Sequence, residues 1–302
     1  IKKRTGRTRE ALPEFNFKKE QIPEVNDPVL QQYRQSAWAA YKTLSFPNVN
    51  DEAWRRTNIL KLGTSSFSLP DMVDGFPPPP QRLMTPVIIG NGLAGQLVTG
   101  AIQPHQNLKD DLVEKGVIFT DFRSAELSHP ILLRKLLGKV VSFDEDKFSA
   151  LAAAIAKDGV FLYVPKNVVI QQPLHSLYWG AGEKIAFFNH ILIWLEEGAQ
   201  VTFVHESASP KAGLGSQMLQ DGIVELYVGT NAHLNFVELQ SWGPNVWSFT
   251  RERAKVMGNG KLDWIFGAIG THLTKNFSDI DLLEPGAEGR ISGFYFSNGD
   301  QH

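Results

Sequence analysis

The sequence predicts a mainly β protein that follows a smaller, mostly helical region. After Gly159 the chain consists of short β-rich runs broken by Gly, Pro, Asn or Asp, and scarcely any helical periodicity remains. Some runs, such as 191–195, are continuously apolar, which is typical of strands buried on both faces. Strands without helical crossovers argue against a doubly wound α/β sheet and leave a sandwich, a barrel or a β-helix open. The runs lie at 160–164, 168–170, 186–196, 200–205, 222–228, 232–239, 246–253, 261–268 and 290–296.

Helical periodicity marks the chain from Asn26 to about Leu62. Asn26 is placed to cap the first helix, and Pro28 suits its first turn. A second helix is predicted to begin with the acidic turn 51–52 and to end at Gly63. The apolar positions of the first helix, three and four residues apart, are Leu30, Tyr33, Ala37, Tyr41 and Leu44.

A connector and short elements fill the chain between these two regions. The run Pro77–Pro80 predicts an extended, semi-rigid polyproline segment within a Ser- and Pro-rich stretch. Beyond it, 86–89 and 96–99 have strand character and flank Asn91-Gly92, a dipeptide preferred in type I′ hairpin turns. Helices are predicted at 108–115, 130–137 and 144–157.

The amino-acid composition excludes several classes of function. The 302 residues carry 30 Lys and Arg against 32 Asp and Glu, so no global charge excess drives binding to nucleic acid or to an anionic membrane. No apolar run approaches the roughly 18 residues of a membrane-spanning helix. The absence of Cys excludes disulfides, a Cys nucleophile and any thiolate ligand from this chain. Because it opens at Ile1 and stops at His302 directly after a strand-like run, we expect a piece of a longer polypeptide.

A glycine motif at Gly90–Gly95 matches the dinucleotide-binding pattern G-x-G-x-x-G, and Asp110 lies downstream. That fingerprint requires a helix directly after the glycines. Gly100 and Pro104 oppose such a helix, because relative to Ala they cost about 1 and about 3 kcal/mol in a helix interior. The sequence therefore favours a hairpin here over a nicotinamide-dependent oxidoreductase.

Histidines are the candidate transition-metal ligands, but no two have the spacing of a metal motif. His190, His205 and His233 are placed to stack on neighbouring turns of a β fold. Hydrogen-bonded structural histidines are the favoured interpretation. The eight are His105, His129, His175, His190, His205, His233, His272 and His302.

Two further groups of residues are compatible with a carbohydrate-active enzyme. Asp279 and Asp281 would project from one face of a strand, with Glu284 and Arg290 nearby, as an acid/base pair requires. A solvated strand edge is the favoured interpretation of these carboxylates. The tryptophans of the β-rich half would form a sugar-stacking surface or, as is more usual at strand spacing, part of the core. They are Trp179, Trp194, Trp242, Trp247 and Trp264.

In order and spacing, several segments resemble the SufB/SufD family of iron-sulfur cluster assembly proteins, and the SufD members most closely. The resemblance runs from about Pro23 to His302. The segments are Phe46-Pro47, the E-x-W-R-x-T sequence within 51–57, the start of the β region at 156–166, and 189–193, 197–199 and 231–234.

The resemblance implies a right-handed parallel β-helix behind a small α/β N-terminal domain. The implied organisation is a basic flexible tail at 1–22, an N-terminal domain at 23–158 with a Pro-rich connector near 76–81, and a β-helix at 159–302 that is incomplete at its C-terminal end. Residues implicated in cluster formation lie in later turns in this family. We therefore assign no catalytic, cofactor-binding or metal-binding residue to this chain.

For function, the resemblance implies a non-enzymatic scaffold subunit. Its expected partners are a SufB-like paralogue and a SufC-like ABC ATPase, with no nucleic acid and no membrane. A transient iron-sulfur cluster and a reduced flavin would belong to the full complex. The expected location is the bacterial cytoplasm, or the plastid stroma in a photosynthetic eukaryote. A polysaccharide-active β-helix enzyme, a lyase or hydrolase, is the alternative.

Overall fold

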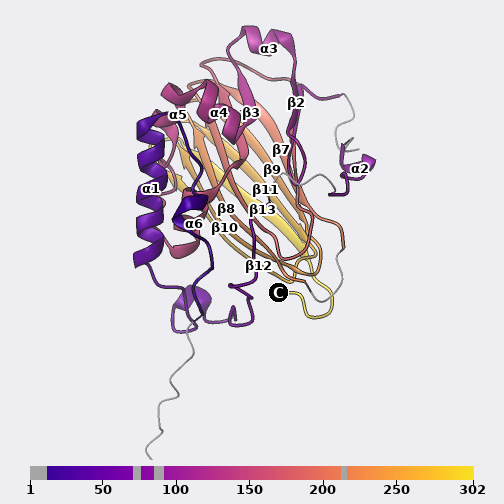
Figure 1. Ribbon diagram of the computed structural model, residues 1–302. Helices are drawn as coiled ribbons and strands as arrows, with labels where there is room; N and C mark the ends of the chain where they lie inside the picture. The colour runs from indigo at the N-terminus through magenta and orange to yellow at the C-terminus, as the bar shows by residue number, and fades with distance from the viewer. Residues whose placement is uncertain (1–11, 71–75, 85–91, 212–215) are drawn as a thin grey trace, which may run out of the picture.

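The computed structural model describes residues 12–70, 76–84, 92–211 and 216–302 (Figure 1). The strands of these ranges form two sheets, and the longer helices lie on one side of them. The helices are the short 3₁₀ helices η1 (Lys19–Gln21) and η2 (Glu52–Trp54) and the α-helices α1 (Pro28–Thr43), α2 (Gln81–Met84), α3 (Asp110–Glu114), α4 (Phe122–Ser128), α5 (Pro130–Leu136) and α6 (Lys147–Ile155).

From β4 onward, each sheet takes every second strand of the chain. The orders are β13-β11-β9-β7-β5-β1-β2 and β12-β10-β8-β6-β4-β3. The strands are β1 (Gly95–Gly100), β2 (His105–Leu108), β3 (Ile118–Asp121), β4 (Asp158–Val164), β5 (Leu174–Trp179), β6 (Ala186–Leu195), β7 (Gln200–Ala208), β8 (Met218–Val228), β9 (His233–Ser241), β10 (Val246–Val256), β11 (Lys261–Ile269), β12 (Leu273–Leu282) and β13 (Glu288–Phe296).

From β4 onward the chain coils, because each successive strand joins the other sheet. All pairings among these strands are parallel, and only β1–β2 and β3–β4 are antiparallel. The predicted mainly β class with a helical N-terminal region is confirmed. The connectivity fits the predicted β-helix, while its right-handed sense stays a prediction.

A left-handed backbone corner recurs at the passage from the six-stranded to the seven-stranded sheet. The corner residue follows each even-numbered strand from β4 to β12 and has a φ between 52° and 76°. Only Gly and, to a lesser degree, Asn adopt this conformation routinely, which explains the residue types found. The corners are Asn167, Gly198, Asn231, Asn259 and Gly286.

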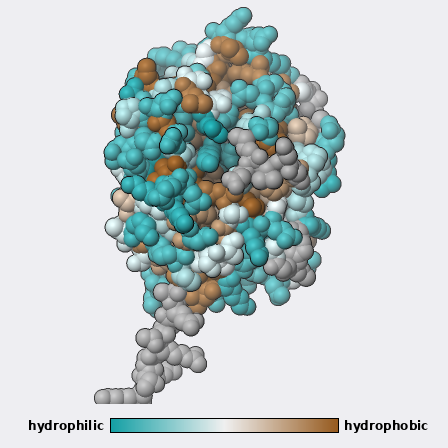
Figure 2. Space-filling view, in the orientation of Figure 1, coloured by the Kyte–Doolittle hydropathy of each residue, from teal (hydrophilic) through white to brown (hydrophobic). Residues whose placement is uncertain are grey.

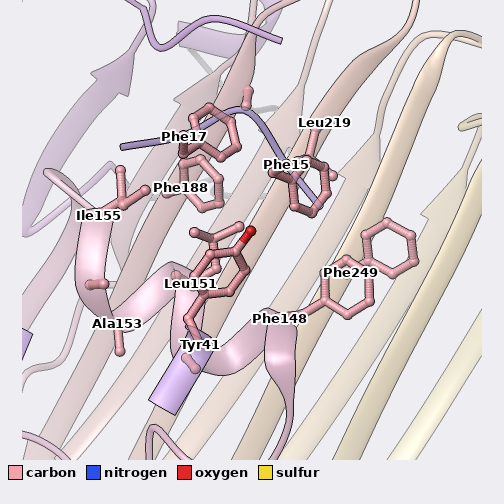
Figure 3. Close-up of a cluster of buried hydrophobic side chains, with 14 of the residues drawn as sticks. Phe15, Phe17, Tyr41, Phe148, Leu151, Ala153, Ile155, Phe188, Leu219 and Phe249 are labelled. Atoms are coloured by element: carbon pink, nitrogen blue, oxygen red, sulfur yellow. The ribbon is translucent and has the colours of Figure 1, made fainter. Parts of the chain in front are cut away.

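The helical layer packs on the outer face of the six-stranded sheet. Helix α6 lies against β6, β8 and β10, and α1 packs against α6. Figure 3 shows the apolar cluster beneath α6, where Phe148 stacks on Phe249 of β10 with ring centroids 4.2 Å apart. Tyr41 of α1 and Leu219 of β8 join the same cluster. On the face seen in Figure 2, hydrophilic side chains predominate.

The predicted tail differs from the structure over residues 12–22. Residues 1–11 lie outside the described part of the chain, but Phe15 and Phe17 are buried. Phe15 packs edge-on against Phe148, and Phe17 packs edge-on against Phe188 of β6. Burial of these aromatic rings explains why the segment lies on the helical layer despite the basic residues ahead of it.

Another sequence prediction differs from the structure, and several elements were not predicted. The predicted second helix reduces to η2 and turns, because Trp54 lies flat on Phe148, with centroids 5.7 Å apart, and this packing outweighs local propensity. Strands β2, β3 and β5 and helix α4 were not predicted. The segment after Gly95 is strand β1, as the sequence favoured, which contradicts the dinucleotide-binding alternative. The predicted turn at Asn91 lies outside the described residues.

Strands β1, β2 and β3 precede residue 159 and are nevertheless hydrogen-bonded into the two sheets. The boundary at 158/159 therefore stays a prediction. Within the described ranges, no helix combines the length and apolar character needed to cross a bilayer.

We expect Asp27→Ala to lower the free energy of unfolding by about 1 to 2 kcal/mol. The Asp27 carboxylate, not Asn26, caps α1 by accepting hydrogen bonds from the backbone N–H groups of Val29 and Leu30, and it also lies 3.4 Å from Arg134. Denaturant unfolding followed by circular dichroism measures the loss. Asn26→Ala is the matched control and should change stability by less than about 0.5 kcal/mol. Equal losses in both variants would contradict the assignment of the cap.

Candidate functional site

The three histidines that were predicted to stack do not meet. His190 lies on β6 in the six-stranded sheet, whereas His205 and His233 lie on β7 and β9 in the other sheet. The register places His205 beside Glu238, and His233 beside Gln200. In the described part of the chain, no three His, Asp or Glu side chains are arranged to hold a metal ion.

The buried histidines have the hydrogen bonds of structural residues, as predicted. His190 Nε2 lies 2.9 Å from Glu225 Oε1, and its ring stacks on Phe122. His205 Nδ1 lies 2.7 Å from Ser176 Oγ, and its Nε2 lies 3.0 Å from Ser207 Oγ. Burial lowers the pKa of His205 to about 3, so its ring is neutral.

The carboxylates of the carbohydrate-active alternative lie on the outermost strand of the six-stranded sheet. Asp279 and Asp281 on β12 are 52% and 44% exposed. Both face Arg253, at 3.4 and 3.8 Å. Arg290 instead pairs with Asp263, at 2.6 Å. Asp279 and Asp281 therefore share one face of a strand, as predicted. Their common partner is Arg253, and they lie at a solvated strand edge.

The tryptophans of the β-rich half mostly belong to the core, as predicted. Trp194 is the partly exposed one, and it stacks on Tyr227 with ring centroids 3.8 Å apart. The buried ones are Trp179, Trp242, Trp247 and Trp264. No sugar-stacking surface made of all five exists, because their rings lie in different clusters.

A groove of about 1190 Å³ lies at one end of the coil, lined in part by tryptophans and prolines. Trp179 Nε1 donates a hydrogen bond of 2.7 Å to the carbonyl oxygen of Pro77. This contact holds the Pro-rich connector, whose residues 76–80 belong to no helix or strand. The groove wall is thus formed partly by the chain's own polyproline segment.

Between the two sheets the interior carries a band of polar side chains, here called the polar seam. Phe203 and Phe236 belong to the apolar interior cluster, and the residues two positions on, His205 and Glu238, therefore face the interior as well. The seam consists of Ser176, Tyr178, His205, Ser207, Glu238 and Gln240 from the seven-stranded sheet and Asn189, Gln220, Ser248, Thr250, Glu252 and Ser278 from the six-stranded sheet.

Hydrogen bonds run along the seam from coil to coil. Gln220 Nε2 donates to Asn189 Oδ1 at 2.9 Å, and Ser248 Oγ donates to Gln220 Oε1 at 2.5 Å. These three residues lie on the neighbouring strands β6, β8 and β10. Ser278 Oγ donates to Glu252 Oε2 at 2.5 Å, which extends the seam to β12. The hydrogen-bonded residues of the seam therefore lie on four neighbouring strands of the six-stranded sheet, β6, β8, β10 and β12.

Two carboxyl groups occupy the middle of the seam. The exposed fraction is 3% for Glu238 and 0% for Glu252. Burial raises the pKa of Glu238 to about 7. Burial, followed by the nearby charge of Glu238, raises the pKa of Glu252 well above its usual range. Sequence reasoning missed this pair, although both residues follow the alternation of interior positions that Phe236 of β9 and Ala254 of β10 mark.

A coil of two parallel sheets with a polar interior and a helical layer on one face defines a coiled β protein, not a doubly wound α/β enzyme. Residues 10–175 match the family model of the SufBD protein N-terminal region. Residues 178–302 match that of the SUF system FeS cluster assembly, SufBD core domain. The chain belongs to the SufBD family.

Curated bacterial proteins show the same similarity. The chain is 34% identical over 197 residues to an iron-sulfur cluster assembly SufBD family protein of Staphylococcus epidermidis. It is 33% identical over 197 residues to a protein of the same description from Staphylococcus aureus. Each match covers 65% of this chain and 42% of the relative. The chain thus spans less than half the length of the curated relatives it matches.

Proposed function

We propose that this chain is part of a SufD-like, non-enzymatic scaffold subunit that acts in iron-sulfur cluster assembly. The observation that carries the proposal is the combination of both SufBD family matches with a chain that contains no Cys. Clusters are held mainly by Cys thiolates, and these 302 residues supply none. Their absence from this part of the subunit favours a SufD-like role over that of the Cys-bearing paralogue.

The partners proposed are a SufB-like paralogue and a SufC-like ABC ATPase. In this arrangement the ATPase hydrolyses ATP, the paralogue supplies thiolates, and the present subunit provides a rigid coiled framework. The iron-sulfur cluster is cargo, and a reduced flavin would serve the assembled complex as electron source. The proposed setting is the bacterial cytoplasm, which the staphylococcal relatives favour, with the plastid stroma as its counterpart in a photosynthetic eukaryote.

We expect the full-length protein, isolated from its host by affinity under anaerobic conditions, to bring both partners with it. Mass spectrometry should find an ABC-type ATPase and a Cys-containing paralogue in near-stoichiometric amounts. An untagged host extract is the control for non-specific capture. Full-length protein that captures neither partner would contradict the proposal and would lead to a test of uronan cleavage, with Asp279→Asn as the matched variant.

A further inference from the structure

Several buried polar atoms without partners lie in the polar seam. In folded proteins more than nine-tenths of buried polar groups have a hydrogen-bond partner, either in the protein or in an ordered water. Three seam atoms lack such a partner among the described residues, namely Tyr178 OH, Gln240 Oε1 and Thr250 Oγ1. The carboxyl groups of Glu238 and Glu252 share a hydrogen bond with each other, and Glu238 is also hydrogen-bonded to the indole of Trp264.

The chemistry of these atoms indicates the occupant. Both donors and acceptors are present, on strands of both sheets, as a bound water molecule with two to four polar partners requires. A metal ion fits less well, since no group of three ligands exists within the described ranges. An apolar ligand would leave the same atoms without partners.

The surroundings of the two carboxyl groups are uncharged. Across the sheet, β7 presents His205 to Glu238, and that imidazole is neutral. On the other side, β11 presents Phe266, and β12 presents Ser278 to Glu252. In the register Val224 of β8 lies beside Glu252. None of these described neighbours is a cation, so no counter-ion is available to hold both carboxylates ionised.

We propose that the polar seam binds a file of internal water molecules and that Glu238 and Glu252 together hold a single proton at its centre. The proton comes from solvent when the chain folds, so the pair carries one negative charge in place of two. Two carboxyl groups in a low-dielectric interior share a proton for this reason in other proteins as well. The waters supply the hydrogen bonds that the orphaned atoms lack.

Oxygen-17 magnetic relaxation dispersion on the purified protein tests the water file. We expect a contribution from long-lived internal waters that Gln240→Leu diminishes by at least one molecule, because that change removes a polar partner inside the seam. The matched control is Gln200→Leu at the exposed start of β7, which should leave the contribution unchanged. A wild-type protein without long-lived waters would refute the file.

Infrared spectroscopy in D₂O tests the shared proton. We expect the carbonyl band of one protonated carboxyl group in the difference spectrum between the wild-type protein and the double variant Glu238→Gln/Glu252→Gln at pH 7. The double variant is needed because burial favours the protonated form of whichever single carboxyl group remains. The difference spectrum removes the band of the buried Asp221, whose pKa burial also raises. The exposed Glu288→Gln is the control and should retain the band. A spectrum without the band, or a band that survives both seam substitutions, would overturn the proposal.

The pH dependence of unfolding gives a second readout. Because the folded pair still holds at pH 7 a proton that the unfolded chain releases above about pH 4.3, stability should fall as the pH rises from about 4.3 through 7. We expect the double variant Glu238→Gln/Glu252→Gln to lose stability less steeply over this range, by one proton, and we expect Glu288→Gln to follow the wild-type protein. A double variant with the wild-type slope would contradict a proton held by the pair.

Discussion

Replacing Glu225 by Ala is expected to lower the free energy of unfolding by about 3 to 5 kcal/mol, the cost of removing one partner from a buried charged network. The carboxylate of Glu225 on β8 is fully buried. Its Oε1 accepts a hydrogen bond from the backbone N–H of Gly138, and its Oε2 accepts from Val140 and Val141. Without it, three buried N–H groups and the ring of His190 lose their acceptor.

This carboxylate fastens the loop between α5 and α6 to the outer face of the six-stranded sheet. Urea unfolding measures the loss, and limited proteolysis should show cleavage near residue 139 before the sheets are cut. Glu197→Ala is the matched control, because that carboxylate is half-exposed and pairs with Lys166 at the surface. Its expected cost is at most about 1 kcal/mol. Similar costs at the two positions would show that the loop is held by other contacts.

The loop that Glu225 holds also illustrates what the sequence predicts well. The helices on either side of it were predicted within a few residues, because their apolar periodicity is strong and Gly159 marks the change to strands. The role of Glu225 in holding the loop was not predicted. A Glu in an apolar strand is recognisable as unusual, but its partners lie more than 80 residues away and come together only in the fold.

The coil could not be predicted from a sequence repeat, for a geometric reason. Its corners need a left-handed residue, which Asn and Gly both supply, and the intervals between successive corners are unequal. A search for a fixed period therefore finds no repeat. The family resemblance implied a β-helix, whereas strand periodicity left a sandwich or barrel open, because continuous apolar runs are buried on both faces in several architectures.

Local patterns failed where distant packing decides the structure. Trp54 lies on Phe148, so the segment that was predicted as a second helix follows the surface of α6 and forms only one 3₁₀ turn. Phe15 and Phe17 were counted in a tail because the basic residues ahead of them dominate that window. The polar seam was missed for a related reason, since its members are spread over strands β5 to β12 and come together only in the folded coil.

Arg34→Met is expected to destabilise the protein by about 3 to 5 kcal/mol at pH 7, because it leaves a buried carboxylate without its cation. Arg34 on α1 is fully buried, and its Nε and Nη2 both donate to Glu126 Oε1 of α4, at 2.9 and 2.7 Å. Its Nη1 donates to the carbonyl oxygen of Ala154 at the end of α6. One guanidinium thus joins three helices of the layer.

The double variant Arg34→Met/Glu126→Met separates the ion pair from packing. Replacing both members of a buried pair by apolar residues of similar volume is often nearly neutral, so the double variant should recover most of the stability that Arg34→Met loses. Burial raises the pKa of Glu126, and the charge of Arg34 lowers it. Without Arg34 that pKa rises further, so the deficit of the single variant should grow as the pH increases from 5 to 8. Denaturant unfolding across this range measures both effects. A deficit that is independent of pH and is not relieved in the double variant would mean that Arg34 acts through its packing and through Ala154, not through Glu126.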